Sequence, residues 1–165
     1  MNTLPLTRIG FFNPGRLNDQ EIEQSFIARI PLFQFIFNKI IAEDPDSIPQ
    51  HHLIIGQRGM GKTALLLRIG VELRKKPYSD NWIALNFPEE QYNVDRLSKF
   101  WLNCLDALAD ALEKENNTEA VKKLDFEIQN LSKKNNDTEG FLLYEKWIKT
   151  LNRRPVLLVD NLNLI

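Results

Sequence analysis

The chain has 165 residues, and its 21 Lys and Arg against 22 Asp and Glu give a formal net charge of −1. This balance argues against a histone-like or polybasic nucleic-acid binder. The hydrophobic share of 43% excludes a disordered chain. The single cysteine, Cys104, excludes an internal disulfide framework and suits a reducing compartment.

No apolar run approaches the roughly 18–20 residues of a membrane span, and residues 1–5 lack the charged start of a signal peptide. The sequence therefore predicts a cytoplasmic protein without a membrane partner.

Residues 1–50 are predicted to hold an extended lead-in followed by two helices. The pair Asn18-Asp19 offers an N-cap for the first helix, whose apolar face follows as Ile22, Phe26 and Ile30. Pro31 breaks this helix but suits the first turn of a second, strongly apolar one. Residues 44–49 are a loop by composition.

Residues 51–165 alternate between short apolar runs and amphipathic segments. Three runs are predicted as buried strands, at His52–Ile55, Trp82–Phe87 and Val156–Asp160. Apolar residues at helical spacing predict helices over residues 64–75, 97–112, 121–131 and 141–151. Strands that alternate with helices predict an α/β fold with a parallel sheet. We expect this core to begin at residue 51 and to extend to residue 165.

The most informative segment is a glycine-rich loop at Gly56–Thr63. It fits the pattern G-x-x-x-x-G-K-[ST] at every fixed position, between a predicted strand and a predicted helix. Glycines allow a tight turn that approaches a phosphate closely, and the backbone N–H groups at the helix N-terminus form an anion nest. Lys62 brings a positive charge to the β- and γ-phosphates, and the Thr63 hydroxyl can ligate Mg²⁺. The predicted nucleotide-binding residues are Gly56, Gln57, Arg58, Gly59, Met60, Gly61, Lys62, Thr63 and Ala64. A chance glycine-rich turn is the alternative.

A second acidic element closes the third predicted strand. Four apolar residues end in Asp160, which can hold Mg²⁺ opposite Thr63. Asn161 follows, and its amide cannot accept a proton from an attacking water. Glu89 and Glu90, after the second predicted strand, are candidate bases; the alternative is that both cap the following helix.

The phosphate loop and the acidic strand together resemble the P-loop ATPases of the AAA+ and STAND (signal-transduction ATPases with numerous domains) groups. Phe26–Arg29, followed by Leu32, is similar to the F-hydrophobic-G-R-x-x-x-L segment that precedes the phosphate loop in STAND and origin-recognition-type ATPases, where it packs near the adenine. Ala28 stands in place of the usual glycine. The resemblance covers most of residues 22–165. It implies a three-layer α/β/α P-loop NTPase fold with a parallel sheet, and ATP and Mg²⁺ as cofactors.

The resemblance also implies a sheet order of 5-1-4-3-2, in which a fourth strand separates the strand of Asp160 from the strand before the phosphate loop. No sensor-one strand, arginine finger or helical lid is recognised up to Ile165. We therefore expect the chain to hold the front part of a larger ATPase domain. Direct pairing of Leu53–Ile55 with Val156–Val159 would instead favour the kinase and GTPase division.

The leading hypothesis for function is ATP binding and Mg²⁺-dependent hydrolysis by a nucleotide switch in a larger protein. Its predicted catalytic residues are Lys62, Asp160 and Glu90, and its predicted metal ligands are Thr63 and Asp160. We expect protein partners or self-association through regions outside this sequence. The alternatives are a regulatory nucleotide-binding module with little hydrolysis and a small-molecule P-loop kinase. GTP is not excluded, although no N/T-K-x-D base-recognition motif is present.

Three further groups of residues can be explained either by a functional role or by a purely structural one. His51-His52 has no partner at ligand spacing and is expected to begin a strand rather than hold a metal. Cys104 lies on an apolar helix face and is expected to be a buried thiol. Arg153-Arg154 is expected to be a solvated helix end, with a nucleic-acid contact as the alternative.

Overall fold

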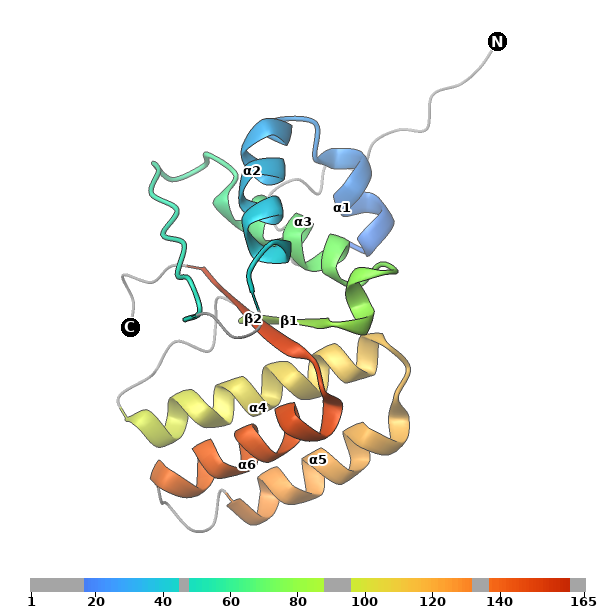
Figure 1. Ribbon diagram of the computed structural model, residues 1–165, viewed down its shortest axis with the longest axis vertical. Coiled ribbons are helices and arrows are strands. Elements are labelled where there is room, and N and C mark those ends of the chain that lie inside the picture. The colour runs from blue at the N-terminus through green and yellow to red at the C-terminus, as the bar shows by residue number, and fades with distance from the viewer. Residues whose placement is uncertain (1–16, 45–47, 88–95, 132–136, 161–165) are drawn as a thin grey trace. The chain divides into compact units, whose positions relative to one another are not determined.

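The computed structural model describes residues 17–44, 48–87, 96–131 and 137–160 (Figure 1). Contacts within the chain divide it into two compact units, residues 1–68 and 69–165. Helices predominate, and the described residues contain one two-stranded parallel sheet. The predicted mixed α/β class with parallel strands is therefore confirmed, whereas the three-layer arrangement and the domain boundary at residue 50 stay predictions.

The first unit begins with two short helices whose boundaries follow from local sequence signals. Helix α1 (Asp19–Ser25) has Asn18 as its N-cap. Asn18 Oδ1 accepts from the Glu21 N–H at 2.9 Å, and the Glu21 carboxylate accepts from the Asn18 N–H at 3.0 Å. This capping box satisfies two backbone donors. Pro31 lies in the first turn of α2 (Ile30–Ile41), where its missing N–H removes no helical hydrogen bond. The predicted N-cap and the place of Pro31 in the first turn of a second helix are confirmed. The first helix is shorter than predicted, because it ends at Ser25 and Ile30 already belongs to α2.

Aromatic contacts hold the first unit together. The Phe33 ring stacks on Phe37 at 5.5 Å between centroids and meets the edge of Phe26 at 5.9 Å. The Arg68 guanidinium, on helix α3 (Lys62–Leu73), lies over the Phe33 ring at 4.7 Å. It is also 3.8 Å from the Glu23 carboxylate of α1. These contacts join α1, α2 and the first part of α3.

The predicted buried strand at His52–Ile55 is wrong. Residues 51–57 have no regular secondary structure, and Leu53 and Ile55 are 72% and 86% exposed. An apolar run forms a strand only where a neighbouring strand takes up its N–H and C=O groups. Among the described residues, no strand pairs with this run.

The second unit contains that sheet. Strand β1 (Trp82–Phe87) pairs in parallel with β2 (Arg154–Val159), in a register that runs from Trp82 opposite Arg154 to Phe87 opposite Val159. Strand β1 has the predicted bounds, because its residues are apolar on both faces and nearly all are buried. Strand β2 starts two residues earlier than predicted, at Arg154, and ends just before Asp160.

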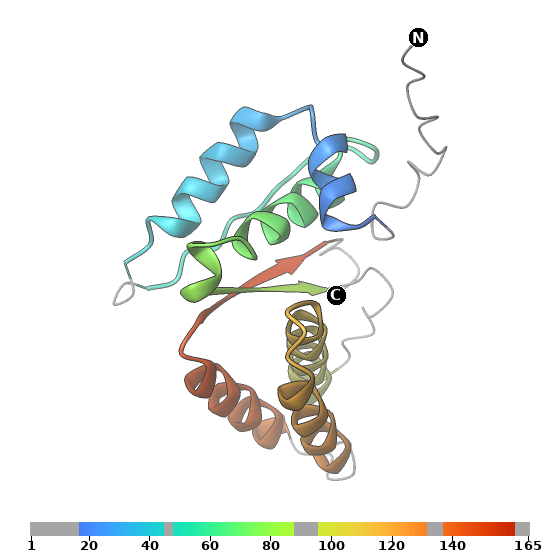
Figure 2. The ribbon, with the colours of Figure 1, turned by 90° about the vertical axis from the view of Figure 1, so that its right-hand side faces the viewer.

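Three helices connect β1 to β2 and lie together on one side of this sheet, as Figures 1 and 2 both show. They are α4 (Leu97–Lys114), α5 (Thr118–Leu131) and α6 (Asp137–Leu151). Helix α4 is central, since it packs against β1, α5 and α6. Its apolar stripe supplies much of the hydrophobic core, with Cys104, Leu105, Leu108 and Leu112 fully buried. All three helices were predicted. The structure extends α4 by two residues at its end, and it extends α5 by three and α6 by four residues at their starts.

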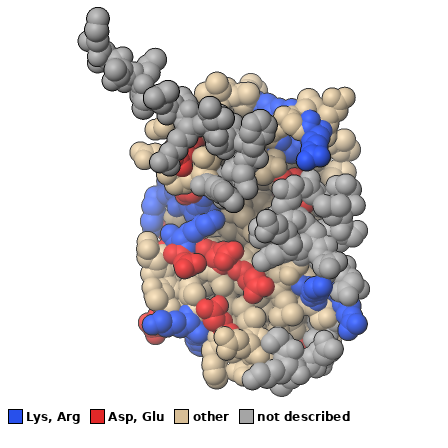
Figure 3. Space-filling model, turned by 180° about the vertical axis from the view of Figure 1, so that it is seen from behind, with Lys and Arg blue, Asp and Glu red and all other residues tan. Residues whose placement is uncertain are grey.

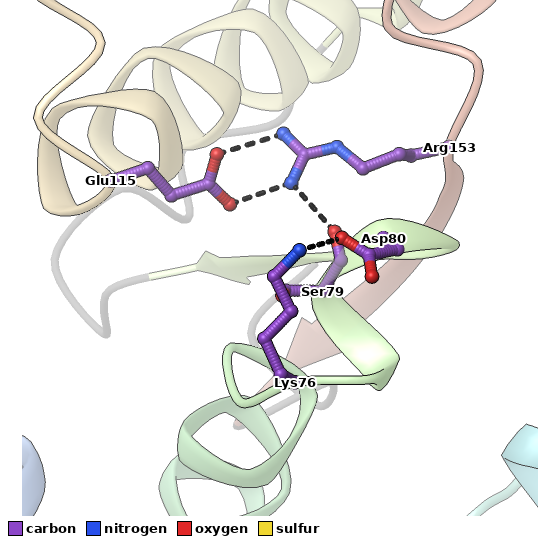
Figure 4. Close-up of polar contacts among 5 residues, drawn as sticks. All are labelled: Lys76, Ser79, Asp80, Glu115 and Arg153. Atoms are coloured by element: carbon purple, nitrogen blue, oxygen red, sulfur yellow. Dashed lines mark hydrogen bonds and ion pairs between the residues drawn. The ribbon is translucent and has the colours of Figure 1, made fainter.

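Arg153 links three elements of the second unit (Figure 4). Its guanidinium donates to both carboxylate oxygens of Glu115 at 2.7 and 2.9 Å, and to the Ser79 carbonyl oxygen at 3.2 Å. Ser79 belongs to the short helix η2 (Tyr78–Asp80), which also carries the Lys76–Asp80 ion pair. The Arg153 side chain is only 12% exposed. The prediction that Arg153 is solvated is therefore wrong, because Glu115, 38 residues away in sequence, sequesters its charge.

Candidate functional site

The loop at Gly56–Thr63 has the backbone conformation that its glycines were expected to permit. Gly59 has φ +81° and Gly61 has φ +75°, in the left-handed region that favours glycine. A β-carbon at either position would meet nothing within 4 Å, so the backbone angle rather than space requires glycine there. The chain then enters α3 at Lys62, and the Leu65 N–H donates to the Gly61 carbonyl at 3.0 Å.

The Lys62 side chain folds back over the start of the loop. Its ammonium donates to the carbonyl oxygens of Gly56 at 2.8 Å and of Gln57 at 3.1 Å. The loop thus curves around a positive charge at the N-terminus of a 12-residue helix. The free N–H groups and the dipole at such a terminus favour an anion.

Met60 makes the loop's other internal contact. The Gln57 N–H donates to Met60 Sδ at 3.3 Å, while the Met60 N–H donates to the Gln57 carbonyl at 3.3 Å. A β-carbon on Gly56 would lie 3.5 Å from Met60 Sδ, so the thioether packs against the Gly56 backbone. The side chains of Gln57, Arg58 and Met60 are exposed, and Thr63 and Ala64 are partly buried at the start of α3. The structure therefore brings the predicted loop residues together as one exposed turn.

The predicted metal ligands are two oxygen donors. Asp160 directly follows β2 at the carboxyl end of the sheet and is 8% exposed. Thr63 belongs to the first unit and Asp160 to the second. Among the described residues, no group of three or more His, Cys, Asp or Glu side chains could hold a metal ion. Mg²⁺ commonly takes one or two protein oxygens together with waters and phosphate oxygens, and a hydroxyl or a carboxylate is each a donor of that kind.

The sequence interpretation missed Asn86, a polar residue in the otherwise apolar strand β1. Within the described part of the chain, its amide Oδ1 is buried and has no hydrogen-bond partner. A β-carbon at Gly70 of α3 would lie 3.0 Å from this oxygen and 3.3 Å from Leu158. Glycine at position 70 therefore lets the Asn86 amide approach the helix. The feature of the sequence that could have indicated this residue is a single amide side chain within a run of apolar residues.

Three residues of the predicted chemistry, Glu89, Glu90 and Asn161, lie outside the described residues. Charge on the described surface is mixed: on the face drawn in Figure 3, Lys and Arg form several separate groups with Asp and Glu between them. A broad field of one sign, which nucleic-acid backbones favour, is not seen among the described residues of that face. No helix in the described ranges is both long enough and apolar enough to cross a bilayer.

Comparisons with known proteins return nothing: no protein-family model, no curated protein and no solved structure matches this chain.

Proposed function

We propose that residues 56–64 bind the phosphates of ATP, and that the chain acts as a nucleotide switch of the AAA+/STAND type on a three-layer P-loop fold. One observation carries the proposal. A loop with two left-handed glycines, Gly59 and Gly61, runs into the N-terminus of α3 while the Lys62 ammonium lies across it. Backbone N–H groups, a helix dipole and an ammonium then converge on one exposed turn, which is the environment that a polyphosphate needs.

The roles of the side chains follow from their chemistry. Lys62 exchanges its two carbonyl partners for oxygens of the β- and γ-phosphates and stabilises the charge that develops in the transition state. The Thr63 hydroxyl and the Asp160 carboxylate hold Mg²⁺, which neutralises phosphate charge. Glu90 or Glu89 serves as the base that orients water.

The pairing within the second unit agrees with a parallel sheet of the P-loop type. In the order 5-1-4-3-2, the strand that ends in the acidic residue lies beside the strand that precedes it in sequence. The structure pairs β2 with β1 in this way.

Nucleotide binding is tested with one variant and a matched control. Lys62→Ala removes the ammonium and is expected to weaken ATP binding about a hundredfold in calorimetry. Lys39→Ala removes a lysine of α2 that lies over the Phe35 ring and is the matched control, with unchanged affinity. Equal ATP affinity of Lys62→Ala and the unaltered chain would overturn the proposal.

A regulatory module that binds ATP without hydrolysing it is the second candidate, and Asn161 favours it because an amide cannot act as a base. Asp160→Asn is expected to retain most ATP affinity and to abolish Mg²⁺-dependent phosphate release. If the unaltered chain releases phosphate from ATP and the Asp160→Asn variant releases less, the chain is an ATPase. ATP binding without measurable release assigns the regulatory module.

A further inference from the structure

We propose that Met60 is an oxidation site through which hydroperoxides weaken phosphate binding at the loop. The proposal rests on the proposed function, since the loss that it expects is a loss of nucleotide affinity. It goes further in assigning a modification and a regulatory role to a variable position of the loop.

The first step of the argument is where the thioether lies. Met60 Sδ accepts a hydrogen bond from the Gln57 N–H at 3.3 Å and packs against Gly56. Met60 is nevertheless 46% exposed. An oxidant dissolved in water can therefore reach this residue, whose sulfur atom is part of the loop's hydrogen bonding.

The second step is selectivity among the sulfur atoms of the chain. The sequence contains two methionines, Met1 and Met60, and one cysteine. Cys104 is fully buried in the core of the second unit, and burial raises the pKa of its thiol to about 12. It therefore has almost no reactive thiolate near neutral pH. Met60 is the exposed sulfur within the described residues.

The third step is the reaction itself. A lone pair on Met60 Sδ attacks one oxygen of hydrogen peroxide, an S–O bond forms and the O–O bond breaks. The second oxygen leaves as water after proton transfer. The thioether is oxidised to a sulfoxide and the peroxide is reduced to water. Methionine sulfoxide reductases reverse this change.

The fourth step is the consequence for the loop. A thioether is a weak hydrogen-bond acceptor, whereas a sulfoxide is polar and carries a partly negative oxygen. A sulfoxide is bulkier and more polar than the thioether that lies against Gly56 and the Gln57 N–H, so these contacts are expected to change. The sulfoxide oxygen then competes with phosphate oxygens for the loop's N–H groups and for the Lys62 ammonium.

The test compares the full chain before and after mild peroxide treatment. Mass spectrometry locates the added oxygen, and calorimetry measures ATP affinity. We expect oxygen on Met60 of the folded protein and an affinity about tenfold lower, which recovers after treatment with the reductase. Met60→Leu has a similar volume but no sulfur, and peroxide is expected to change its ATP affinity less than about twofold from that variant's own untreated value.

Several results would overturn the proposal: a folded protein whose Met60 stays unmodified, an oxidised protein with unchanged affinity, or an equal loss in peroxide-treated Met60→Leu. Circular dichroism checks that each sample is folded. If the untreated chain binds no ATP, the proposed function itself fails and this inference falls with it. ATP binding that peroxide does not alter overturns the inference alone.

Discussion

At the scale of single residues, Arg153 shows how a charge that looks exposed in the sequence becomes structural. Its planar guanidinium meets Glu115 through two parallel hydrogen bonds and donates a third to the Ser79 carbonyl. Both charged side chains are largely covered, at 12% and 27% exposure. Bidentate pairs of this kind are stronger than exposed ion pairs, because two charge-assisted bonds are made in a fixed geometry.

Arg153→Lys is therefore expected to lower the free energy of unfolding by about 1–2 kcal/mol, since lysine supplies a point charge without the fork of donors. Urea unfolding measures the change, and a double-mutant cycle with Glu115→Gln isolates the pair. Lys149→Ala is the matched control: its ion pair with Glu145 is exposed, and its loss should change stability by less than about 0.5 kcal/mol. Equal effects of the Arg153 and Lys149 variants would contradict this assignment.

Among the site residues, the loop could be predicted from the sequence because its signal is local. Gly59 and Gly61 adopt left-handed angles, as the motif indicates, and the helix occupies Lys62–Leu73, two residues earlier at each end than predicted. The positions of two variable residues could not be predicted. Met60 folds back onto the Gln57 N–H, and the motif places no constraint on that side chain.

At the scale of elements, α4 carries two carboxylates one turn apart. Burial raises the pKa of Asp106, and the neighbouring charges of Asp110 and of Asp125 on α5 raise it further. Burial likewise raises the pKa of Asp110, although Lys114 acts in the opposite direction. The folded chain therefore binds protons at Asp106 more tightly than the unfolded chain does. Stability contributed by this group is present at low pH and is lost as the pH rises above the ordinary Asp value of 3.8.

Asp106→Asn is accordingly expected to stabilise the chain at pH 7, by about 0.5 kcal/mol for relief of a like-charge pair at i, i+4. Near pH 3 the two carboxyls are largely protonated in both states, so the difference should vanish. Urea unfolding at both pH values measures this. Asp110→Asn should act in the same direction with a smaller effect, because Lys114 offsets part of the repulsion. A variant that is less stable than the unaltered chain at pH 7 would contradict the argument.

The strands show how far element prediction reaches. Trp82–Phe87 and His52–Ile55 are both short apolar runs, but only the first forms a strand. Strand β1 pairs with β2 and packs against α4. Both partners are distant in sequence, so residues 82–87 alone do not predict these contacts. Helices were predicted better, because their hydrogen bonds close within the segment and the apolar spacing of α4, α5 and α6 is local information.

At the scale of the whole molecule, protection from hydrogen exchange should differ between the core of the second unit and the segment before the glycine-rich loop. We expect amides of β1 and α4 to exchange slowest with deuterium, since they lie in the buried core of the second unit. Residues 51–56 belong to no helix or strand and should exchange fastest among the described residues. Hydrogen exchange followed by mass spectrometry measures both. Protection of Leu53–Ile55 equal to that of β1 would show that this run is a paired strand.

The sequence by itself determined the phosphate-loop pattern, the N-cap at Asn18, the bounds of β1 and the succession of helices, because each depends on residues close together in the chain. Only the tertiary structure decided that β2 pairs with β1, that Arg153 binds Glu115, that Gly70 makes room for the Asn86 amide and that residues 51–57 form no strand. The physical reason is the range of the interactions. Helix caps and glycine turns are satisfied within a few residues, whereas strand pairing and buried charge depend on groups brought together from distant parts of the chain.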